Sequence, residues 1–518
     1  MILLWLGTFA TLPAQFDING LKLMEVMDKV SKYYVDSLDE EAFVEQTITM
    51  MLHELDPHSS YITAEELKEM SEQLSGEFEG IGISFNVLND TIFVVGTIQG
   101  GPSERVGILA GDRIIRVDGE NVAGIGIKTT GVQKRLKGKK GTEVDVGIYR
   151  KTTGQELDFT IIRDKIPVYS LDASYMVDDE TGYIKLSRFS QTTADEFEEA
   201  LKELDDQGME NLILDLSGNG GGYLRIAVEL ADHFLGSGSQ IVYTEGDKVP
   251  RRDYKATSRG MFEDGKLVIM IDENSASASE IVSGAVQEWD RGVLVGRRSF
   301  GKGLVQQPFR LNDGSEMRLT IARYYTPTGR LIQKPYDNGY DDYAQDILNR
   351  YQSGEMSSSD SILFPDSLKY RTLVSKRVVY GGGGIMPDYF VPLDTTFNTE
   401  YYRRMIGSGV FNNFVLDYMD RKRTSLERKY KDFEVFSEKF DPEPVMDDLI
   451  RFAEEEGVTF SEEDWNRSGD RIAMLFKAYV ARDLWENGKF YEIYNEEDPI
   501  FLKAREILST PGFYVEKL

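Results

Sequence analysis

Two continuous apolar segments constrain the fold of this chain more than any other feature. Residues 211–216 (NLILDL) and 266–271 (KLVIMI) have the length and composition of strands that are buried on both faces of a sheet. Segments with helical spacing flank the first of them, for example at residues 223–235. Strands that alternate with helices predict an α/β layer, which we place at residues 166–394 with a polar insertion at about 335–376.

The rest of the chain contains three regions with different sequence patterns. Residues 16–75 have helical spacing, which is broken at the turn LDPHSSY. Residues 76–165 contain short strands separated by glycine turns, such as GIGISFNV and TIFVVGTI, and predict a small β-rich domain. Residues 395–518 have mainly helical patterns, with charged runs typical of solvated helix faces. We therefore predict an α/β protein of several domains, with α+β character outside the layer.

The net charge and the absence of cysteine exclude several classes of function. The 518 residues carry a net charge of −29, so nucleic acid or an anionic lipid surface would meet a field of its own sign. Without cysteine, thiol catalysis, disulfides and cysteine-ligated metals are excluded. The three histidines, His53, His58 and His233, are too few for mechanisms that need several imidazoles.

The first 15 residues (MILLWLGTFATLPAQ) have the apolar length of a signal peptide and end near the small residue Ala14. The usual basic residues before the apolar run are missing. The run is shorter than the roughly 20 residues that span a bilayer. A buried N-terminal helix is the alternative. We expect export to the periplasm or cell envelope.

The segment after the second apolar strand places a serine where a helix begins. Ala278, Ile281, Val282 and Ala285 recur at helical spacing, so Ser277 lies at or just before the helix N-terminus. Unpaired backbone N–H groups and the positive end of the helix dipole would stabilise a developing oxyanion there. Ser277 is a candidate nucleophile, although Ser/Ala runs open many helices that have no catalytic role.

A serine hydroxyl needs a base, and the chain offers two candidates. His233 lies in a helical apolar pattern that favours a packed, structural histidine. Lys302 lies in the sequence FGKG, where Phe300 would supply apolar cover and burial would lower the amine pKa from about 10.4 toward neutrality. Gln306, four residues later, is neutral and could orient the amine without keeping it protonated.

Together these segments resemble the active-site signature of the carboxyl-terminal processing peptidases, also called tail-specific proteases. SASASEIVSGA followed by SFGKGLVQ is similar to the family's serine and lysine motifs, with Ser277 and Lys302 at the matching positions. LDPHSSYIT, LILDLSGNGGG, IARYYTPTGRLIQ and GGGGIMPD resemble further motifs of the family. The resemblance extends over roughly residues 20–390.

The resemblance implies a crotonase-like protease core with an inserted PDZ domain and helical N- and C-terminal regions. It implies a serine endopeptidase that cleaves proteins near their C-terminus, with Ser277 as nucleophile, Lys302 as general base and Gln306 holding Lys302. The N–H groups of Ala278 and Gly221 would bind the oxyanion. No metal or organic cofactor is implied.

The glycine-rich loop at residues 217–222 departs from the family pattern at two positions. Ser217 stands where the family has arginine, and Gly220 stands where it has proline. The glycines would still turn backbone N–H groups toward one point, as in an anion-binding nest. A phosphate cradle is the alternative, but no Lys-Ser/Thr pair follows the glycines.

The β-rich domain resembles the PDZ domain of this family. Gly80, Ile81, Gly82 and Ile83 resemble the loop that binds a peptide C-terminal carboxylate, and the next strand would pair with the peptide by β-augmentation. We therefore expect protein or peptide partners with apolar C-termini and no nucleic acid. An envelope adaptor protein and homo-oligomer formation are left open.

Two alternative functions remain at this point. One is a catalytically inactive PDZ scaffold that only binds peptides, against which the presence of both Ser277 and Lys302 argues. The other is a hydrolase that uses Ser277 with His58 or His233.

Overall fold

The structure is a computed structural model that describes residues 18–510 and 512–518. The predicted signal peptide at residues 1–15 lies outside the described residues. Among the helices that are described, none is both long enough and apolar enough to span a membrane.

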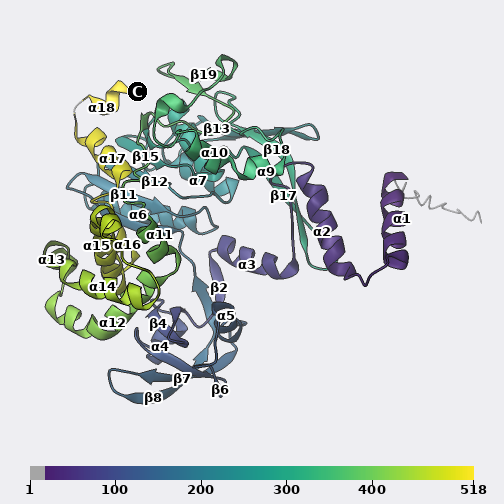
Figure 1. Cartoon of the computed structure of the whole chain (residues 1–518). Helices are drawn as coiled ribbons and strands as arrows, with labels where there is room; N and C mark the ends of the chain where they lie inside the picture. Colours follow the sequence, from purple (N-terminus) through teal and green to yellow (C-terminus); the bar gives the residue numbers. More distant parts are fainter. Residues whose placement is uncertain (1–17, 511) are drawn as a thin grey trace, which may run out of the picture.

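A six-stranded sheet forms the centre of the molecule (Figure 1). Its strands in spatial order are β10 (Leu171–Met176), β11 (Thr181–Leu186), β12 (Asn211–Asp215), β15 (Lys266–Ile271), β16 (Val293–Gly296) and β21 (Tyr389–Phe390). All neighbours are parallel except β10, which is antiparallel to β11. The two apolar segments of the sequence are β12 and β15, side by side in the middle of this sheet, which confirms the predicted α/β layer.

Helices cover both faces of the central sheet, and alternate residues of its strands point to them. Leu212 and Leu214 pack with α6 (Thr193–Asp206), α7 (Leu224–Asp232) and α8 (Ala278–Glu288) in one apolar core. Ile213 lies between them and packs with α17 (Pro499–Ser509) in the core on the opposite face. The C-terminal region therefore completes the core around the central sheet instead of only lying beside it.

A second, antiparallel sheet lies against this layer. Its order is β1-β18-β13-β14, with β17 also paired to β18. The strands are β1 (Ser60–Ile62), β13 (Gln240–Gly246), β14 (Val249–Lys255), β17 (Leu304–Arg310) and β18 (Glu316–Tyr325). The polar insertion expected at about 335–376 is folded, not a structureless loop. It contains α9 (Tyr340–Ala344), α10 (Asp346–Gln352), η1 (Ser359–Ser361), η2 (Asp366–Leu368) and β19 (Lys369–Arg371), which pairs with β20 (Val378–Tyr380).

The β-rich domain is a separate sheet with its own apolar core. It consists of β3 (Ile83–Leu88), β4 (Thr91–Thr97), β5 (Arg113–Val117), β6 (Glu120–Asn121), β7 (Glu143–Arg150) and β8 (Gln155–Ile162), with helices α4 (Pro102–Val106) and α5 (Thr129–Leu136). Strand β3 is an edge strand of this sheet. A two-stranded ribbon of β2 (Glu77–Gly80) and β9 (Asp164–Pro167) connects the domain to the core.

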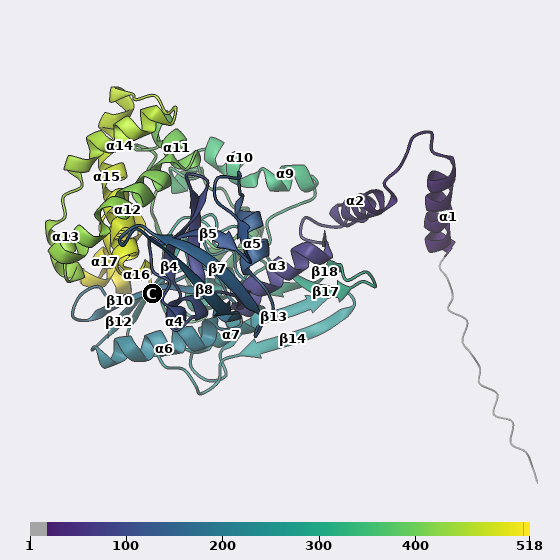
Figure 2. The same ribbon diagram turned by 90° about the horizontal axis from the view of Figure 1, so that it is seen from below.

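Helices form both ends of the described chain. At the N-terminal end are α1 (Ile18–Tyr33), α2 (Glu40–His53) and α3 (Ala64–Ser75), and α1 stands apart from the body with no buried residue (Figures 1 and 2). The C-terminal region contains α11 (Glu400–Gly407), α12 (Val410–Lys429), α13 (Phe433–Lys439), α14 (Glu443–Glu455), α15 (Glu462–Leu484), α16 (Asn487–Tyr494) and α18 (Phe513–Glu516), besides α17. Most of its helices share one aromatic-rich core.

Candidate active site

Ser277 lies in the turn that joins β15 to α8, directly before the first helical residue Ala278. Its backbone has a φ of +54°, which is uncommon for a residue other than glycine. Such conformations persist only where the surroundings enforce them. The sharp turn therefore presents Ser277 at the positive end of α8, as the sequence predicts.

The hydrogen bonds of the Ser/Ala run distinguish its serines. Ser275 is buried, and its hydroxyl donates to the carbonyl oxygen of Leu216 at 2.8 Å. Ser279 is also buried, and its hydroxyl donates to the carbonyl oxygen of Asn219 at 2.8 Å. The Ser277 hydroxyl is half-buried and donates to no described residue, while its oxygen takes part in the capping box of α8 with the backbone N–H of Glu280. Of these three serines, only Ser277 has a hydroxyl proton that no described acceptor engages.

Ser277 lines a cavity of about 830 Å³ between the second sheet and the N-terminal ends of α7 and α8. Gln306 on β17 lines the same cavity. Apolar and aromatic side chains form much of the remaining wall, among them Leu224, Tyr254, Ile281, Leu304 and Tyr324. A cleft of this size and lining suits an extended peptide segment with apolar side chains.

The glycine-rich loop packs directly against the serine turn. Gly221 has a φ of +100°, and a methyl group there would lie 2.8 Å from Ser277 Cβ and 3.0 Å from the nitrogen of Ala278. Only glycine fits this close approach. The N–H of Ala278 donates to no described residue, whereas the N–H of Gly221 donates to Asn219 Oδ1 at 2.9 Å. In this conformation, therefore, Ala278 is available to an oxyanion and Gly221 is not, in contrast to the expectation for Gly221.

A lysine lies beneath the glycine-rich loop. Lys185 on β11 donates to the carbonyl oxygen of Ser217 at 2.5 Å and pairs with Asp215 at 3.0 Å. The hydroxyl of Ser217 itself is buried without a hydrogen-bond partner among the described residues. The loop thus keeps a cation beneath it although its own sequence supplies none.

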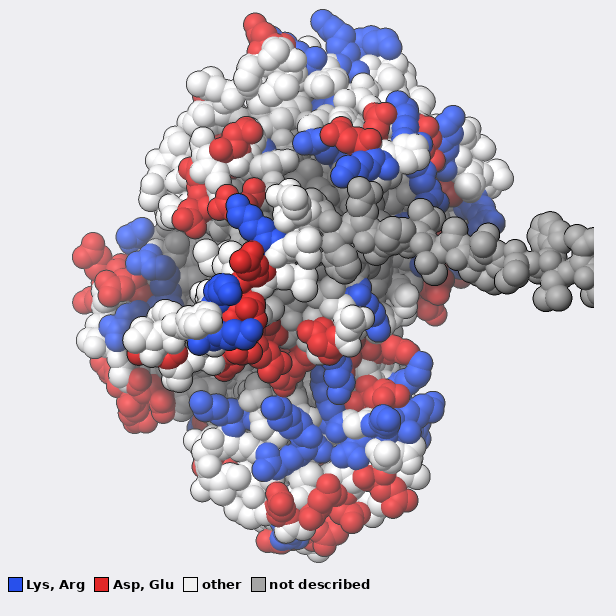
Figure 3. Space-filling model, turned by 90° about the vertical axis from the view of Figure 1, so that its right-hand side faces the viewer, with Lys and Arg blue, Asp and Glu red and all other residues white. Residues whose placement is uncertain are grey.

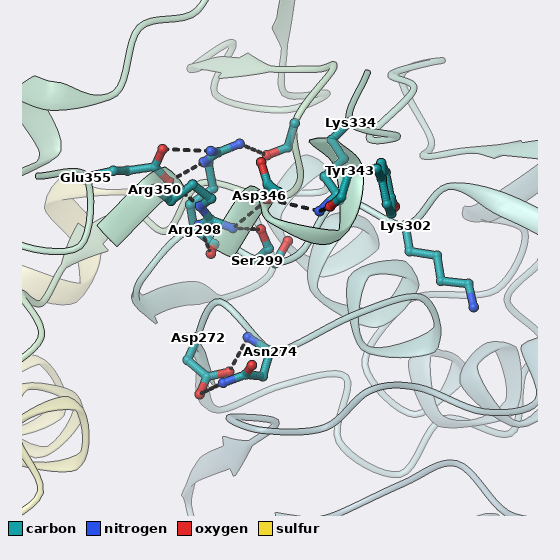
Figure 4. Close-up of polar contacts among 12 residues, drawn as sticks. Asp272, Asn274, Arg298, Ser299, Lys302, Lys334, Tyr343, Asp346, Arg350 and Glu355 are labelled. Carbon is teal, nitrogen blue, oxygen red and sulfur yellow. Dashed lines mark hydrogen bonds and ion pairs between the residues drawn. The ribbon is translucent and has the colours of Figure 1, made fainter. Parts of the chain in front are cut away.

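Lys302 lies in the loop between β16 and β17, and its side chain points away from the ionic cluster around Arg298 and Glu355 (Figure 4). Its amine has no hydrogen bond or ion pair with the described residues. Burial lowers the pKa of the Lys302 amine below 10.5, while the charge of Glu280 acts in the opposite direction. Phe300 does not provide the expected apolar cover for Lys302, because its ring packs on another lysine. The ring centroid lies 3.9 Å from Lys334 Nζ.

One buried carboxylate joins the serine turn to the lysine loop. Oε2 of Glu280 accepts hydrogen bonds from the backbone N–H groups of Ser277 at 2.8 Å and Lys302 at 2.9 Å. Oε1 accepts from Gly301 N–H at 2.7 Å and from the Ser299 hydroxyl at 2.5 Å. Burial raises the pKa of Glu280, and these four hydrogen bonds oppose the rise. Glu280 therefore fixes the two loops relative to each other.

A tyrosine makes a second bridge between the same two loops. The hydroxyl of Tyr324 on β18 contacts the carbonyl oxygens of both Ser277, at 3.2 Å, and Lys302. Sequence reasoning did not single out Tyr324, although it lies in the quoted segment IARYYTPTGRLIQ. It also missed Glu280, although Ser277 and Glu280 form the S-x-x-E spacing of a helix capping box, which could have revealed it.

The side chains of the expected dyad are not in contact. Neither the Ser277 hydroxyl nor the Lys302 amine bonds to the other, and Lys302 is absent from the cavity wall that Ser277 and Gln306 share. Gln306 does not hold Lys302 here, because its Nε2 contacts Thr320 Oγ1 at 3.4 Å. The backbones of Ser277 and Lys302 are adjacent, so rotation of the lysine side chain is the movement that contact requires.

The LDPHSSY turn docks beside the lysine. Asp56 Oδ1 accepts hydrogen bonds from Ser59 N–H at 2.9 Å and from Thr320 Oγ1 at 2.9 Å, which fixes the turn to β18. Burial is the main cause that lowers the pKa of His58 to about 3, and the protonated form of Lys302 acts in the same direction. His58 is therefore a neutral imidazole at physiological pH, and its Nε2 lies 2.7 Å from the Tyr343 hydroxyl.

His233 lies away from the cavity. It follows α7, is buried, and packs against Phe197 with ring centroids 5.6 Å apart. Its Nδ1 has no hydrogen-bond partner among the described residues. A packed histidine is what its helical pattern predicts, and it is not placed to activate Ser277.

The glycine turn of the β-rich domain lines a groove of about 390 Å³. The groove lies between β3 and α5 and contains Gly80, Ile81, Gly82 and Ile83 together with the side chains of Phe78, Phe85, Leu136 and Lys137. The N–H groups of Ile81 and Gly82 donate to no described residue. Because β3 is an edge strand, an extended peptide can pair with it while its carboxylate approaches these N–H groups.

Three family models match the chain. Residues 180–340 match peptidase family S41, residues 80–161 match the PDZ domain, and residues 401–486 match DUF8443, a family of unknown function. The first two correspond to the sheet that carries Ser277 and to the β-rich domain with the groove.

Curated relatives of this chain are named carboxy-terminal processing proteases. The carboxy-terminal-processing protease of Bartonella bacilliformis is 37% identical over 316 residues, which are 60% of this chain and 71% of that protein. The carboxy-terminal processing protease CtpB of Bacillus subtilis is 36% identical over 331 residues, 62% of this chain and 68% of that protein. Among solved structures, the photosystem II D1 C-terminal processing protease is 28% identical with a TM-score of 0.34, and the match covers 60% of this chain and 84% of that one.

A serine at a strained strand-to-helix turn, a buried lysine in the adjacent loop and a PDZ domain are thus found in a chain that matches these proteases over most of their length. The alternatives of an inactive scaffold and a Ser/His hydrolase are less well supported. This chain belongs to the carboxy-terminal processing proteases of peptidase family S41 and is a serine-type peptidase with a PDZ domain.

Proposed function

We propose that Ser277 and Lys302 are the catalytic dyad of this peptidase. The observation that carries the proposal is the shared carboxylate of Glu280, which accepts hydrogen bonds from the backbone N–H groups of both residues. The hydroxyl proton of Ser277, which no described acceptor engages, and the lowered pKa of Lys302 support it further. An amine whose pKa is lowered by burial and that faces no competing acceptor is better suited than an ordinary lysine to take a proton from serine.

The reaction follows from these roles. Lys302 turns toward Ser277 and accepts the hydroxyl proton while Oγ attacks the carbonyl carbon of the scissile peptide bond. The N–H of Ala278 stabilises the oxyanion, and Gly221 becomes a second donor once Asn219 releases its N–H. Lys302 then donates the proton to the leaving amine, and water hydrolyses the acyl-enzyme. Gln306, on the cavity wall, takes up the amine of Lys302 during this movement.

The PDZ groove would bind the C-terminal tails of protein substrates. Gly80, Ile81, Gly82 and Ile83 surround the carboxylate, and the apolar walls accept the terminal side chain. A bound tail anchors the substrate while a segment upstream of it enters the cavity with Ser277. An envelope adaptor that presents substrates and a homo-oligomer that brings several grooves together are compatible with this role.

We propose that the chain is divided into five parts. Residues 1–15 would direct export to the periplasm or cell envelope, 16–75 form the N-terminal helical region and 76–165 the PDZ domain. Residues 166–394 form the protease core and 395–518 the C-terminal helical region. Packing of α17 on the central sheet indicates that the last two are not separable.

Cleavage of denatured casein tests the dyad. Lys302→Ala removes a side chain that makes no hydrogen bond or ion pair with the described residues, so the variant should fold and lose cleavage, as should Ser277→Ala. Lys248→Ala, at an exposed turn between β13 and β14, is the matched control and should retain wild-type turnover. Wild-type turnover in Lys302→Ala would remove the dyad from the mechanism.

A further inference from the structure

The PDZ domain carries positive charge in a strongly acidic chain. Residues 80–161 contain 11 Lys and Arg against 9 Asp and Glu, whereas the chain as a whole has a net charge of −29. Within the domain, residues 128–140 (KTTGVQKRLKGKK) contain six cations and no acidic residue. The lower lobe in Figure 3 accordingly shows a band of Lys and Arg across its upper part. This basic segment contains α5.

Helix α5 is one wall of the tail-binding groove, and its two ends mark the two ends of the groove. Leu136 and Lys137 lie at the carboxylate end, where a methyl group on Gly80 would be 3.7 Å from the Cα of Lys137. Thr129, the first residue of α5, lies at the other end. A peptide with its carboxylate at Gly80–Ile83 therefore extends toward the N-terminus of α5 as it leaves the groove.

Most cations of the basic segment already have partners. Lys137 pairs with Glu72 on α3, and Lys140 pairs with Asp164 at 2.7 Å. Lys134 lies 3.7 Å from Glu65 on α3. Lys128, directly before α5, is exposed and pairs with no described residue. Lys128 is thus the unpaired cation at the end of the groove from which the upstream part of a tail emerges.

Two neighbouring features affect the electrostatic potential at Lys128. Helix α5 begins with no side-chain cap, so its first N–H groups remain available to an anion. Asp90, on the turn after β3, directs both of its oxygens to the backbone N–H groups of Gly126 and Ile127, at 2.7 and 3.0 Å. Both oxygens of Asp90 are thus engaged by the backbone, and Asp90 forms no ion pair with Lys128 among the described residues.

The geometry sets the position at which a tail would meet Lys128. The seven residue steps from Thr129 to Leu136 cover roughly 10 Å along a helix axis, and an extended peptide covers that length in about three residues. We propose that the PDZ groove prefers tails with an apolar C-terminal residue and an Asp or Glu about three to four residues before it, recognised by Lys128. This inference rests on the proposed tail-binding role of the groove.

Peptide binding to the full-length Ser277→Ala protein tests the proposal without cleavage. Two fluorescein-labelled ten-residue peptides end in the same three apolar residues and differ only in Glu or Gln at the third and fourth positions before the last residue. Fluorescence anisotropy at low salt should give about threefold tighter binding of the acidic peptide, the size expected of one exposed charge pair. The difference should shrink at high salt.

Charge-removing variants assign the preference to one residue. Lys128→Gln should abolish the difference between the two peptides. Lys139→Gln removes the same charge from an exposed lysine of the same segment at the opposite end of α5, and it should keep the difference. Equal affinity of the two peptides for the unsubstituted groove, or an unchanged preference in Lys128→Gln, would overturn the inference while leaving tail binding intact. Failure of both peptides to bind would overturn tail binding and the inference together.

Discussion

Three glycines of the glycine-rich loop allow its contact with Ser277 to be tested, because alanine adds a single methyl group at each position. An alanine at Gly221 would have a φ of +100° and a Cβ only 2.8 Å from both Ser277 Cβ and the carbonyl oxygen of Ala276. Gly218 has a φ of +72° but open space around its added methyl, and Gly220 has open space without a positive φ. Alanine thus introduces backbone strain and steric overlap at Gly221, backbone strain alone at Gly218, and neither at Gly220.

The expected magnitudes follow from these differences. Gly220→Ala should change the free energy of unfolding by no more than about 0.5 kcal/mol, as at other open sites. Gly218→Ala should lose about 1–2 kcal/mol for the left-handed conformation. Gly221→Ala adds an overlap cost of about 1–3 kcal/mol, and its methyl displaces the turn that carries both the Ser277 hydroxyl and the N–H of Ala278. Loss of oxyanion stabilisation lowers kcat by about 10²–10³.

Urea unfolding followed by circular dichroism measures the stability of each variant, and cleavage of denatured casein measures kcat. Labelling with a fluorophosphonate probe counts the competent serines, so a lower kcat is separated from misfolding. If kcat of Gly221→Ala stayed within twofold of the wild type, the loop could not be in contact with the reacting serine. Equal damage from Gly220→Ala would refute the geometric argument as well.

Three further changes test other parts of the site. Glu280→Gln leaves at least one buried N–H of the two loops without an acceptor, which lowers the free energy of unfolding by about 1–3 kcal/mol. In this variant kcat should fall far more than KM rises. The control Glu273→Gln weakens only a pair with Arg297 and should retain kcat. The double variant His58→Gln with His233→Gln should keep most casein cleavage. Neither imidazole is placed to act on Ser277, and His58 has a pKa of about 3. Loss of all activity would favour a Ser/His mechanism. Asp420→Asn on α12 removes the ion pairs to Arg113 and Lys151 of the PDZ domain, so hydrogen exchange in β5 and the β7–β8 turn should accelerate. Asp417→Asn removes an ion pair within α12 and should leave this exchange unchanged.

The sequence predicted the parts of the site that local patterns determine. Continuous apolarity identified β12 and β15, and helical spacing after β15 placed Ser277 at the start of α8. The same reasoning selected Lys302 by its glycine-flanked loop. These features depend on residues that are close in the chain, so one sequence is enough to recognise them.

Contacts between distant segments were beyond local patterns. The contact of Gln306 with Thr320 depends on the register of β17 with β18. The pairing of Asp420 with the PDZ domain joins residues about 300 positions apart in the chain. Such contacts follow from tertiary packing, to which hydrophobic periodicity is insensitive. The donation of Gly221 N–H to Asn219 Oδ1, by contrast, is a local contact of the Asx-turn type between residues two positions apart, and sequence reasoning overlooked it.

The pH dependence of fluorophosphonate labelling of Ser277 tests the central claim most directly. If a buried, neutral Lys302 activates the serine, the labelling rate should rise with pH as the amine loses its proton and reach a plateau below the ordinary lysine pKa of 10.5. Lys302→Met should label slowly, without this inflection. An inflection at the ordinary lysine value, or wild-type labelling of Lys302→Met, would contradict the account.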